Sequence, residues 1–413
     1  MKLYSCHACG GSMEWDGASG GLKCSNCGTT VKVEDTEALG YHPYETLPEF
    51  TSLQDFPEQV IQCPGCGAEI KADAKTVSMG CPYCGASLVF DDRQLYFAKP
   101  DGVAPVMISG DKVRQLVKEW CGRHMFAPNL ASKHLEVKFV SPQYIPFWVF
   151  RAHVRGEYSG RGGKDRTVTR KNDDGTTVTR TVTDWYPIHG TVSDDLENFG
   201  VSADENINKE YADFLFDSTP DDAFAEWKPE YFAGSYSFIP TVPVEDAEEQ
   251  AKDDMKSELE SRTESELRNQ YDHVEFSSFD VEYSDMAWLL DQIPGYFVIC
   301  RYHGGIYVDV VNGVTGEIHG TYPVSFLKVA IAFILAAAAS FAAFAFFVPE
   351  SVSVCTNESC RFSWGVFGTS AAIFGVIALI VYVCIHLWLK GRVLGRDELQ
   401  KNPWLAEIIE KIK

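Results

Sequence analysis

The chain has 413 residues, with 36 Lys and Arg against 58 Asp and Glu, and a formal net charge of −22. This length exceeds one ordinary domain of roughly 100–200 residues. The acidic balance argues against general binding to a phosphate backbone. Residues 1–323 carry a net charge of −24, so we expect an acidic soluble region followed by an apolar C-terminal part.

The N-terminal residues lead directly into a cysteine motif. Residues 1–6 contain no apolar stretch of the kind that marks a secretory signal peptide. The soluble region is therefore expected to face the cytosol, where thiols stay reduced. Cysteine pairs in that compartment are more typical of metal binding than of disulfides.

Eight of the thirteen cysteines form four Cys-x-x-Cys pairs, which repeat as two quartets displaced by 57 residues. Each pair supplies two thiolates, and two pairs complete the tetrahedron that zinc prefers. The expected ligands are Cys6, Cys9, Cys24, Cys27, Cys63, Cys66, Cys81 and Cys84. This pattern predicts two structural zinc ions, one in a ribbon over residues 1–33 and one in a ribbon over residues 58–92. Redox disulfides are the alternative, and His7 is expected to be a solvated loop residue.

The region between the ribbons and the apolar C-terminus predicts an α+β fold. Residues 34–57 have little periodicity and are interpreted as an extended linker, whereas residues 100–322 are expected to form a soluble domain. Apolar periodicity predicts helices over 111–126 and 245–272, and strands over 143–150, 296–301, 306–311 and 317–321. The second helix has a weak apolar stripe at Ala247, Ala251, Met255 and Leu259 and is otherwise expected to be exposed.

A polar β-hairpin is predicted over residues 167–183, around a turn at 172–175. The basic residues in and before it are Arg161, Lys164, Arg166, Arg170, Lys171 and Arg180. This patch is suited to anionic lipid or RNA, but nearby aspartates dilute it, and a solvated hairpin is the favoured interpretation. The ribbons lack a basic stripe, so nucleic acid is disfavoured as a partner.

The C-terminal part contains two long apolar runs. Residues 324–348 and 362–389 are each long enough to cross a bilayer as a helix. Basic residues follow the second run, so we expect a two-pass protein of the cell membrane with both termini cytoplasmic. Residues 349–361 would then be an outer loop, and residues 390–413 a cytosolic basic, amphipathic tail.

Two cysteines fall in the predicted outer loop. Cys355 and Cys360 would face an oxidising exterior, where they are suited to forming a small disulfide. The sequence contains no phosphate-binding loop, no His-Glu-x-x-His and no Gly-x-Ser-x-Gly. We therefore expect no enzymatic activity, and the zinc sites to be structural.

Several short motifs resemble one family when they are taken together and in order. They are the Cys-Pro-x-Cys-Gly knuckles, Phe126-Ala127-Pro128, Tyr144-Ile145-Pro146-Phe147-Trp148, Pro229-Glu230-Tyr231-Phe232-Ala233-Gly234, and Val311-Asn312-Gly313-Val314-Thr315-Gly316 with Pro323. The family consists of bacterial membrane proteins with TFIIB-type zinc ribbons, often labelled helicase- or primosome-like. This chain departs from it in its additional N-terminal ribbon and at Gly295-Tyr296.

The resemblance implies a partner class, because some relatives look like anchors for phage-shock-protein-A-like and flotillin-like (SPFH) stress proteins. The helicase label finds no ATPase motif here. The leading hypothesis is a membrane-anchored zinc-ribbon scaffold that recruits protein partners to the cytosolic face of the membrane. The alternatives are a membrane-tethered nucleic-acid-binding protein, and a subunit of a transporter or membrane enzyme.

Overall fold

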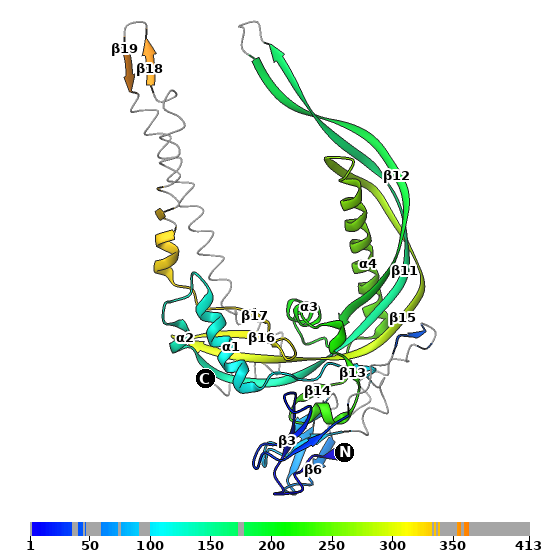
Figure 1. The fold of residues 1–413 in the computed structure, drawn as a ribbon, viewed down its shortest axis with the longest axis vertical. Coiled ribbons are helices and arrows are strands. Elements are labelled where there is room, and N and C mark those ends of the chain that lie inside the picture. Colours follow the sequence, from blue (N-terminus) through cyan, green and yellow to red (C-terminus); the bar gives the residue numbers. More distant parts are fainter. Residues whose placement is uncertain are drawn as a thin grey trace. The chain divides into compact units, whose positions relative to one another are not determined.

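The structure is a computed structural model that describes most of the chain. The described residues are 2–34, 40–43, 46, 59–72, 76–90, 100–171, 177–332, 334–335, 338, 353–356 and 359–362. They combine helices with antiparallel and parallel strands, which confirms the predicted α+β class (Figure 1).

The chain divides into two compact units. The first contains Met1–Ile108, Pro142–Gly295 and Asn312–Thr315, and the second contains Ser109–Ser141, Tyr296–Val311 and Gly316–Lys413. The residues expected to form one soluble domain, 100–322, contribute to both units.

The first four-cysteine motif lies on a three-stranded antiparallel sheet. Its strands are β2 (Met13–Asp16), β3 (Gly21–Cys24) and β4 (Thr30–Lys32), with β3 in the centre. A small core beneath the motif includes Met13 and Leu22, which are almost completely buried. So few apolar side chains cannot by themselves hold a module of this size, because small domains need metals or other cross-links.

The second motif lies on two antiparallel hairpins. One pairs β6 (Gln59–Gln62) with β7 (Glu69–Ala72), and the other pairs β8 (Thr76–Gly80) with β9 (Ser87–Val89). Ile70, Leu88 and Phe90 form its core together with two of the cysteines. The two motifs therefore sit on similar but not identical scaffolds.

Backbone hydrogen bonds join the two ribbons to each other and to the rest of the first unit. The N-terminal strand β1 (Lys2–Leu3) pairs with β9 of the second ribbon. Strand β8 of the second ribbon pairs with β14 (Tyr236–Phe238), which in turn pairs with β11 (Glu136–Lys171). Strands β1, β8 and β9 are thus part of the large sheet, whereas β2–β4 and β6–β7 form small sheets of their own.

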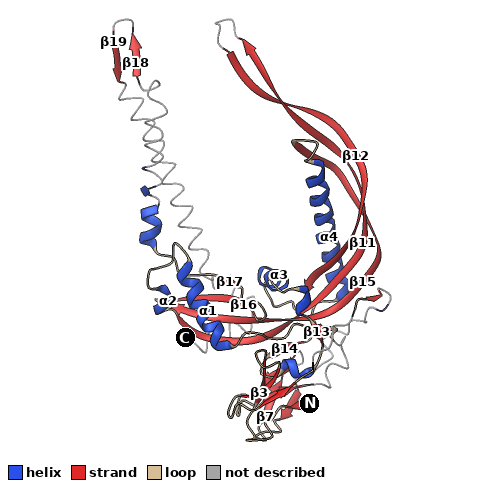
Figure 2. Cartoon of the chain, in the orientation of Figure 1, coloured by secondary structure: helices blue, strands red, loops and turns tan. Residues whose placement is uncertain are grey.

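Three long strands form the largest part of the first unit. They are β11 (Glu136–Lys171), β12 (Thr177–Ser202) and β15 (His273–Tyr302), and β11 lies between the other two (Figure 2). Strands β11 and β12 pair antiparallel from Phe147 opposite Ser202 to Lys171 opposite Thr177, with one irregularity at Phe150 and Ala152. The predicted hairpin is confirmed, but its strands are far longer than the alternating segments had indicated.

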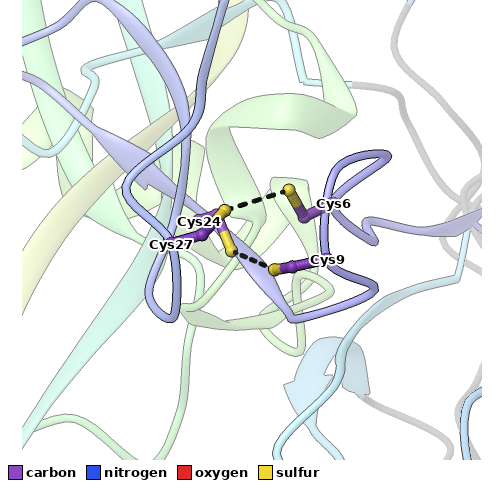
Figure 3. Close-up of side chains that lie close together, drawn as sticks. All are labelled: Cys6, Cys9, Cys24 and Cys27. Carbon is purple, nitrogen blue, oxygen red and sulfur yellow. Dashed lines mark hydrogen bonds between the residues drawn. The ribbon is translucent and has the colours of Figure 1, made fainter.

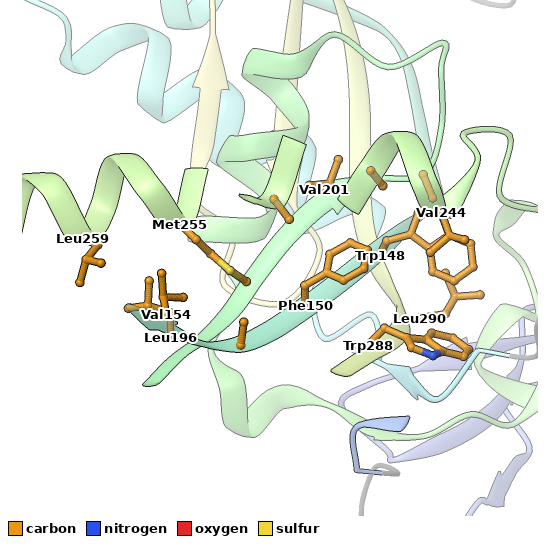
Figure 4. Close-up of a cluster of buried hydrophobic side chains, with 14 of the residues drawn as sticks. Trp148, Phe150, Val154, Leu196, Val201, Val244, Met255, Leu259, Trp288 and Leu290 are labelled. Atoms are coloured by element: carbon orange, nitrogen blue, oxygen red, sulfur yellow. The ribbon is translucent and has the colours of Figure 1, made fainter. Parts of the chain in front are cut away.

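Helix α4 (Val244–Leu267) packs along these strands, and its buried face joins their side chains in the main hydrophobic core (Figure 4). The four residues of the predicted apolar stripe are at most 1% exposed, and they contact Phe150, Val154 and Leu196 in the same cluster. The charged positions of the helix remain mostly exposed. The stripe was therefore predicted correctly. The helix has few apolar residues of its own, and the strands that it packs against supply the other half of the core.

Shorter elements complete the first unit. They are β5 (His42–Pro43), β10 (Gly102–Val103), α3 (Lys209–Asp217), η4 (Asp221–Ala223), β13 (Ala225–Glu226) and η5 (Pro229–Phe232). Strand β5 belongs to the predicted linker 34–57 and pairs with Ala287 and Trp288 of β15. His42 Nε2 lies 2.7 Å from Asp101 Oδ1, so this part of the linker is fixed to the sheet. Much of the remaining linker lies outside the described residues.

The second unit contains α1 (Gly110–Arg123), α2 (Ala131–His134), most of β16 (Gly305–Asn312), and β17 (Ile318–Gly320). The backbone N–H of Lys112 donates to the Ser109 hydroxyl, which caps α1 in the way expected of an N-cap serine. The helix expected over 111–126 and the strand expected over 306–311 are both present.

The predicted membrane segments fall mostly outside the described residues. Residues 326–332 are helical, but residues 339–348 and 363–413 are not described, and the latter range includes nearly all of the second predicted span and the whole tail. Within the described part of the chain, no helix is both long enough and apolar enough to cross a bilayer. In the predicted outer loop, β18 (Ser353–Thr356) pairs with β19 (Ser359–Phe362).

Candidate metal centres

The first four predicted ligands converge at one point (Figure 3). Cys6 and Cys9 come from the loop before β2, and Cys24 and Cys27 come from the end of β3 and the turn that follows. The Sγ atoms of Cys6 and Cys27 are 3.5 Å apart, as are those of Cys9 and Cys24. All four sulfurs lie within 4.8 Å of one another.

The second quartet repeats this arrangement. The Sγ atoms of Cys63 and Cys84 are 3.8 Å apart, and those of Cys66 and Cys81 are 3.9 Å apart. A tetrahedron with zinc–sulfur bonds of about 2.3 Å has sulfur–sulfur edges of about 3.8 Å. The second site therefore has the dimensions of a zinc tetrahedron, and the first is slightly tighter. Both quartets fit a metal ion.

A common backbone turn holds the sulfurs in all four Cys-x-x-Cys-Gly knuckles. In each, the glycine N–H donates to the carbonyl of the first cysteine, at distances of 2.8–3.0 Å. The glycines are Gly10, Gly28, Gly67 and Gly85, with φ between 72° and 76°. Residues with a Cβ rarely adopt this left-handed conformation, so the glycine after each pair is required by the turn.

Hydrogen bonds lower the pKa of particular thiols in both quartets. The hydroxyl and the backbone N–H of Thr29 lower the pKa of Cys27 to about 6. Burial opposes ionisation of Cys81, but the backbone N–H groups of Cys84 and Tyr83 outweigh it and lower its pKa to about 7. A thiolate is the form that binds metal, so each site offers an ionised ligand near neutral pH.

Four thiolates per site leave no coordination position for water or substrate. Such closed sites are structural, because a catalytic zinc keeps one position open. The sulfur–sulfur distances of 3.5–3.9 Å are far longer than the roughly 2.0 Å of a disulfide, and all eight thiols are free. His7 belongs to neither quartet. The two sites are suited to stabilising their ribbons.

Contacts from η5 and from the segments around Val106 and Ala233 complete the first ribbon. Trp15 in β2 donates its indole N–H to the carbonyl of Val106 at 2.9 Å, and its ring packs edge-on against Tyr231, with centroids 4.6 Å apart. Ala233 is 1% exposed and belongs to the same small core as Cys6 and Cys24. These contacts were not predicted from the sequence, although Tyr231 and Ala233 lie in the motif Pro229-Glu230-Tyr231-Phe232-Ala233-Gly234.

Ser87 in β9 joins the two ribbons and the segment after η5. Its backbone N–H donates to the Ser12 hydroxyl at 3.1 Å, and its own hydroxyl accepts a hydrogen bond from the Gly234 N–H at 2.7 Å. Tyr4 adds a hydrogen bond from its hydroxyl to Glu230 at 3.2 Å. Disruption of one ribbon is therefore expected to affect the other.

Two other predicted sites are the disulfide between Cys355 and Cys360 and the basic hairpin. Cys355 lies opposite Cys360 in the β18–β19 register, but their side chains are outside the described part of the structure, so the disulfide stays a prediction. In the basic hairpin, Arg161 pairs with Glu275 at 2.6 Å and Arg166 pairs with Asp184 at 2.5 Å. These ion pairs reduce the positive charge that is available to an external ligand.

One comparison with known proteins gives a relative of this chain. The uncharacterized protein YdjG of Bacillus subtilis strain 168 is 25% identical over 327 residues, which cover 79% of this chain and 92% of YdjG. No family model matches the chain. No solved structure matches it either. The similarity extends over most of both chains but assigns no activity.

Proposed function

We propose that this protein is a two-pass membrane scaffold whose zinc ribbons bind a protein partner at the cytosolic face of the membrane. In this proposal residues 324–348 and 362–389 cross the bilayer, both termini are cytoplasmic, and the zinc ions are structural. No substrate is turned over. The ribbons hold the partner, and the membrane helices determine where it accumulates.

The observation that carries the anchoring part is a cluster of exposed apolar side chains at the start of the first predicted span. Phe326, Leu327, Ile331, Ile334 and Leu335 are between 48% and 68% exposed. Contiguous apolar surface of this kind is rare on soluble monomers and typical of membrane or protein contact. These residues begin an apolar run of the length needed to cross a bilayer.

Closed metal sites support the docking part of the proposal. A zinc ion with four protein ligands cannot bind a substrate, so the ribbon can act only through its surface. The second ribbon offers the more accessible apolar surface. Tyr83, inside its second knuckle, is 69% exposed, and Val60 on β6 is 61% exposed. Strand β6 pairs only with β7 among the described strands, so its outer edge is open to a partner. The first ribbon is more enclosed, because it packs against η5 and the segment after it.

The family resemblance supports a particular partner class, a phage-shock-protein-A-like or SPFH-type membrane protein. A nucleic-acid partner receives less support, because the chain has a net charge of −22 and the ribbons have no basic stripe. Retention of the full-length protein on heparin at moderate salt, lost when the hairpin arginines are replaced, would favour the nucleic-acid alternative.

Alkaline carbonate extraction of native membranes tests the anchor. An integral two-pass protein stays in the pellet, whereas a peripheral protein is released. As a control, the same extraction follows a variant with Leu327, Ile331 and Ile334 replaced by Ser. If the wild-type protein appears entirely in the carbonate supernatant, the anchoring part of the proposal is wrong.

Two variants of the second ribbon test the docking part. Replacing Cys63 and Cys66 by Ser removes two ligands and is expected to unfold the ribbon and release a tagged partner to the cytosol. Tyr83→Ser keeps all four ligands and is expected to weaken partner binding without loss of zinc. Tyr186→Ser is the matched control, because this tyrosine is 47% exposed and lies far along the chain in β12. A partner that remains on the membrane with all three variants would contradict the docking role.

A further inference from the structure

The segment Ser109–Ser141 of the second unit has the opposite charge to the rest of the chain. It carries six Lys and Arg against three Asp and Glu, a net charge of +3, in a protein of net charge −22. It comprises α1, a loop over residues 124–130, and α2. Arg123 and Lys133 lie on either side of the loop, and both are exposed. The segment is therefore basic, although the chain as a whole is acidic.

The loop between α1 and α2 presents apolar side chains to solvent. Met125 is 73% exposed and Leu130 is 50% exposed. The loop is nevertheless held in place, because the Ala127 N–H donates to the His124 carbonyl at 3.0 Å and the Ala131 N–H donates to the Pro128 carbonyl at 2.9 Å. Ala127 and Ala131 are both buried. Two exposed apolar side chains thus project from a fixed loop.

The same loop is attached to the beginning of the helical segment at 326. The Ser325 N–H donates to the Phe126 carbonyl at 2.7 Å, and the Lys328 ammonium donates to the Ala127 carbonyl at 2.7 Å. All of these residues belong to the second unit. The loop is consequently fixed to the first residues of the helical segment, where Phe326 and Leu327 are exposed.

Aromatic rings pack on the approach to the helical segment. The rings of His124 and Tyr322 are stacked with their centroids 3.8 Å apart, and Trp120 packs edge-on against His124 at 4.5 Å. Tryptophan and tyrosine are enriched where a membrane protein passes through the lipid headgroups. The aromatic cluster and the apolar loop therefore both lie by the point where the first predicted span begins.

We propose that this loop and its two flanking basic residues form a binding surface for anionic phospholipid headgroups. Met125 and Leu130 enter the interfacial layer, and Arg123 and Lys133 bind lipid phosphate. This inference rests on the proposed membrane anchor, because the anchor brings the surface to the bilayer. It adds a specific lipid contact that the anchor does not require.

Charge and side-chain type favour a lipid surface over other polyanions. The side chain of Arg123 is 78% exposed, and its ion pair with Glu119 is long at 3.6 Å, so the guanidinium is available to phosphate. The projecting residues of the loop are aliphatic, which suits acyl chains, whereas single-stranded nucleic acid needs aromatic surfaces for base stacking. The basic hairpin of the first unit suits lipid less well, because Arg161 and Arg166 are already paired with carboxylates.

Amide hydrogen exchange of the full-length protein tests the proposal. The protein is reconstituted in vesicles of phosphatidylcholine alone and in vesicles that also contain phosphatidylglycerol. We expect residues 124–131 to exchange about tenfold more slowly in the anionic vesicles, because each basic residue near such a surface adds attraction. Replacing Arg123 and Lys133 by Gln should abolish the difference between the two vesicle types. Replacing Met125 and Leu130 by Ser should reduce protection in both.

A charge-matched control uses the hairpin of the first unit. Replacing Lys164 and Arg180 by Gln removes the same two charges and is expected to leave exchange over 124–131 unchanged. Unaltered exchange in the buried turns of α1 shows that each variant is folded. Equal exchange of the wild-type loop in both vesicle types would overturn the proposal, as would an equal effect of the hairpin control.

The outcomes separate this proposal from the membrane anchor. If the wild-type chain is released by alkaline carbonate, the anchor itself fails. If the chain stays in the bilayer and the loop exchanges equally in both vesicle types, only the lipid-binding surface fails. If an RNA oligonucleotide slows exchange of the loop more than anionic vesicles do, the surface belongs to a different ligand and the lipid assignment is wrong.

Discussion

Asp309 offers a direct test of how burial controls stability in the second unit. Its side chain lies in β16 and is 1% exposed. Its Oδ1 accepts a hydrogen bond from the Thr321 N–H at 3.1 Å, and its other close polar neighbour is the thiol of Cys300. No Lys or Arg in the described chain forms an ion pair with it. Burial therefore raises its pKa to about 8.

This shift fixes the direction of the pH dependence. The carboxyl binds its proton more tightly in the folded state than in the unfolded state, so its contribution to stability is complete below about pH 4 and is lost as the pH rises through 8. Each pH unit in that window lowers the free energy of unfolding by about 1.4 kcal/mol. At pH 7, keeping Asp309 protonated costs about 4 kcal/mol.

Asp309→Asn should remove this cost. Asparagine keeps the oxygen that accepts from Thr321 and has no ionised form, so we expect the second unit to gain up to about 4 kcal/mol at pH 7 and almost nothing at pH 4. Hydrogen exchange of the amides in β16 and β17, corrected for the intrinsic pH dependence of exchange, measures the change. Identical pH slopes for the wild-type protein and the variant would refute the reasoning.

Three further predictions concern the ribbons, the sheet and the topology. Trp15→Ala should lower stability by about 3 kcal/mol and speed exchange of the η5 amides, and unchanged exchange there would show that the first ribbon is not held by this contact. Gly162→Val should cost about 1–3 kcal/mol, because its Cβ would lie 2.5 Å from the Tyr271 ring; thermal unfolding measures the loss, and a neutral result would mean that the ring moves aside. An impermeant thiol reagent applied to intact, reduced cells should label Cys355 and not Cys63, and the reverse pattern would invert the topology.

The metal sites were the part of the protein most accessible from sequence. Each Cys-x-x-Cys-Gly knuckle is a local turn, and the glycine at positive φ and both thiols lie within five consecutive residues. Spacing alone therefore identified which residues come together. The α1 helix could also be predicted, because its cap at Ser109 and its buried Val113 and Val117 follow from local spacing.

The long strands were underestimated for a physical reason. Threonine alternates with valine and arginine at residues 167–170 and 177–183, and this alternation indicates strands from the sequence alone. The buried run from Tyr144 to Phe150 was predicted as a strand from its apolar, aromatic composition, but the glycine-containing part of β11 that follows it gives no clean alternating signal. Aromatic rings stacked over glycines, such as Tyr271 over Gly162, become visible only when the neighbouring strand is in place.

The sequence by itself determined the two four-cysteine sites, the acidic character of residues 1–323 and the apolar runs at the C-terminus, because these depend on composition and short spacing. The tertiary structure decided the rest. It placed Trp15 against Tyr231, buried Asp309, and attached the loop at Phe126 to the start of the helical segment at 326. These contacts join residues that are distant in the chain, and local propensity contains no information about which distant segment will complete a given surface.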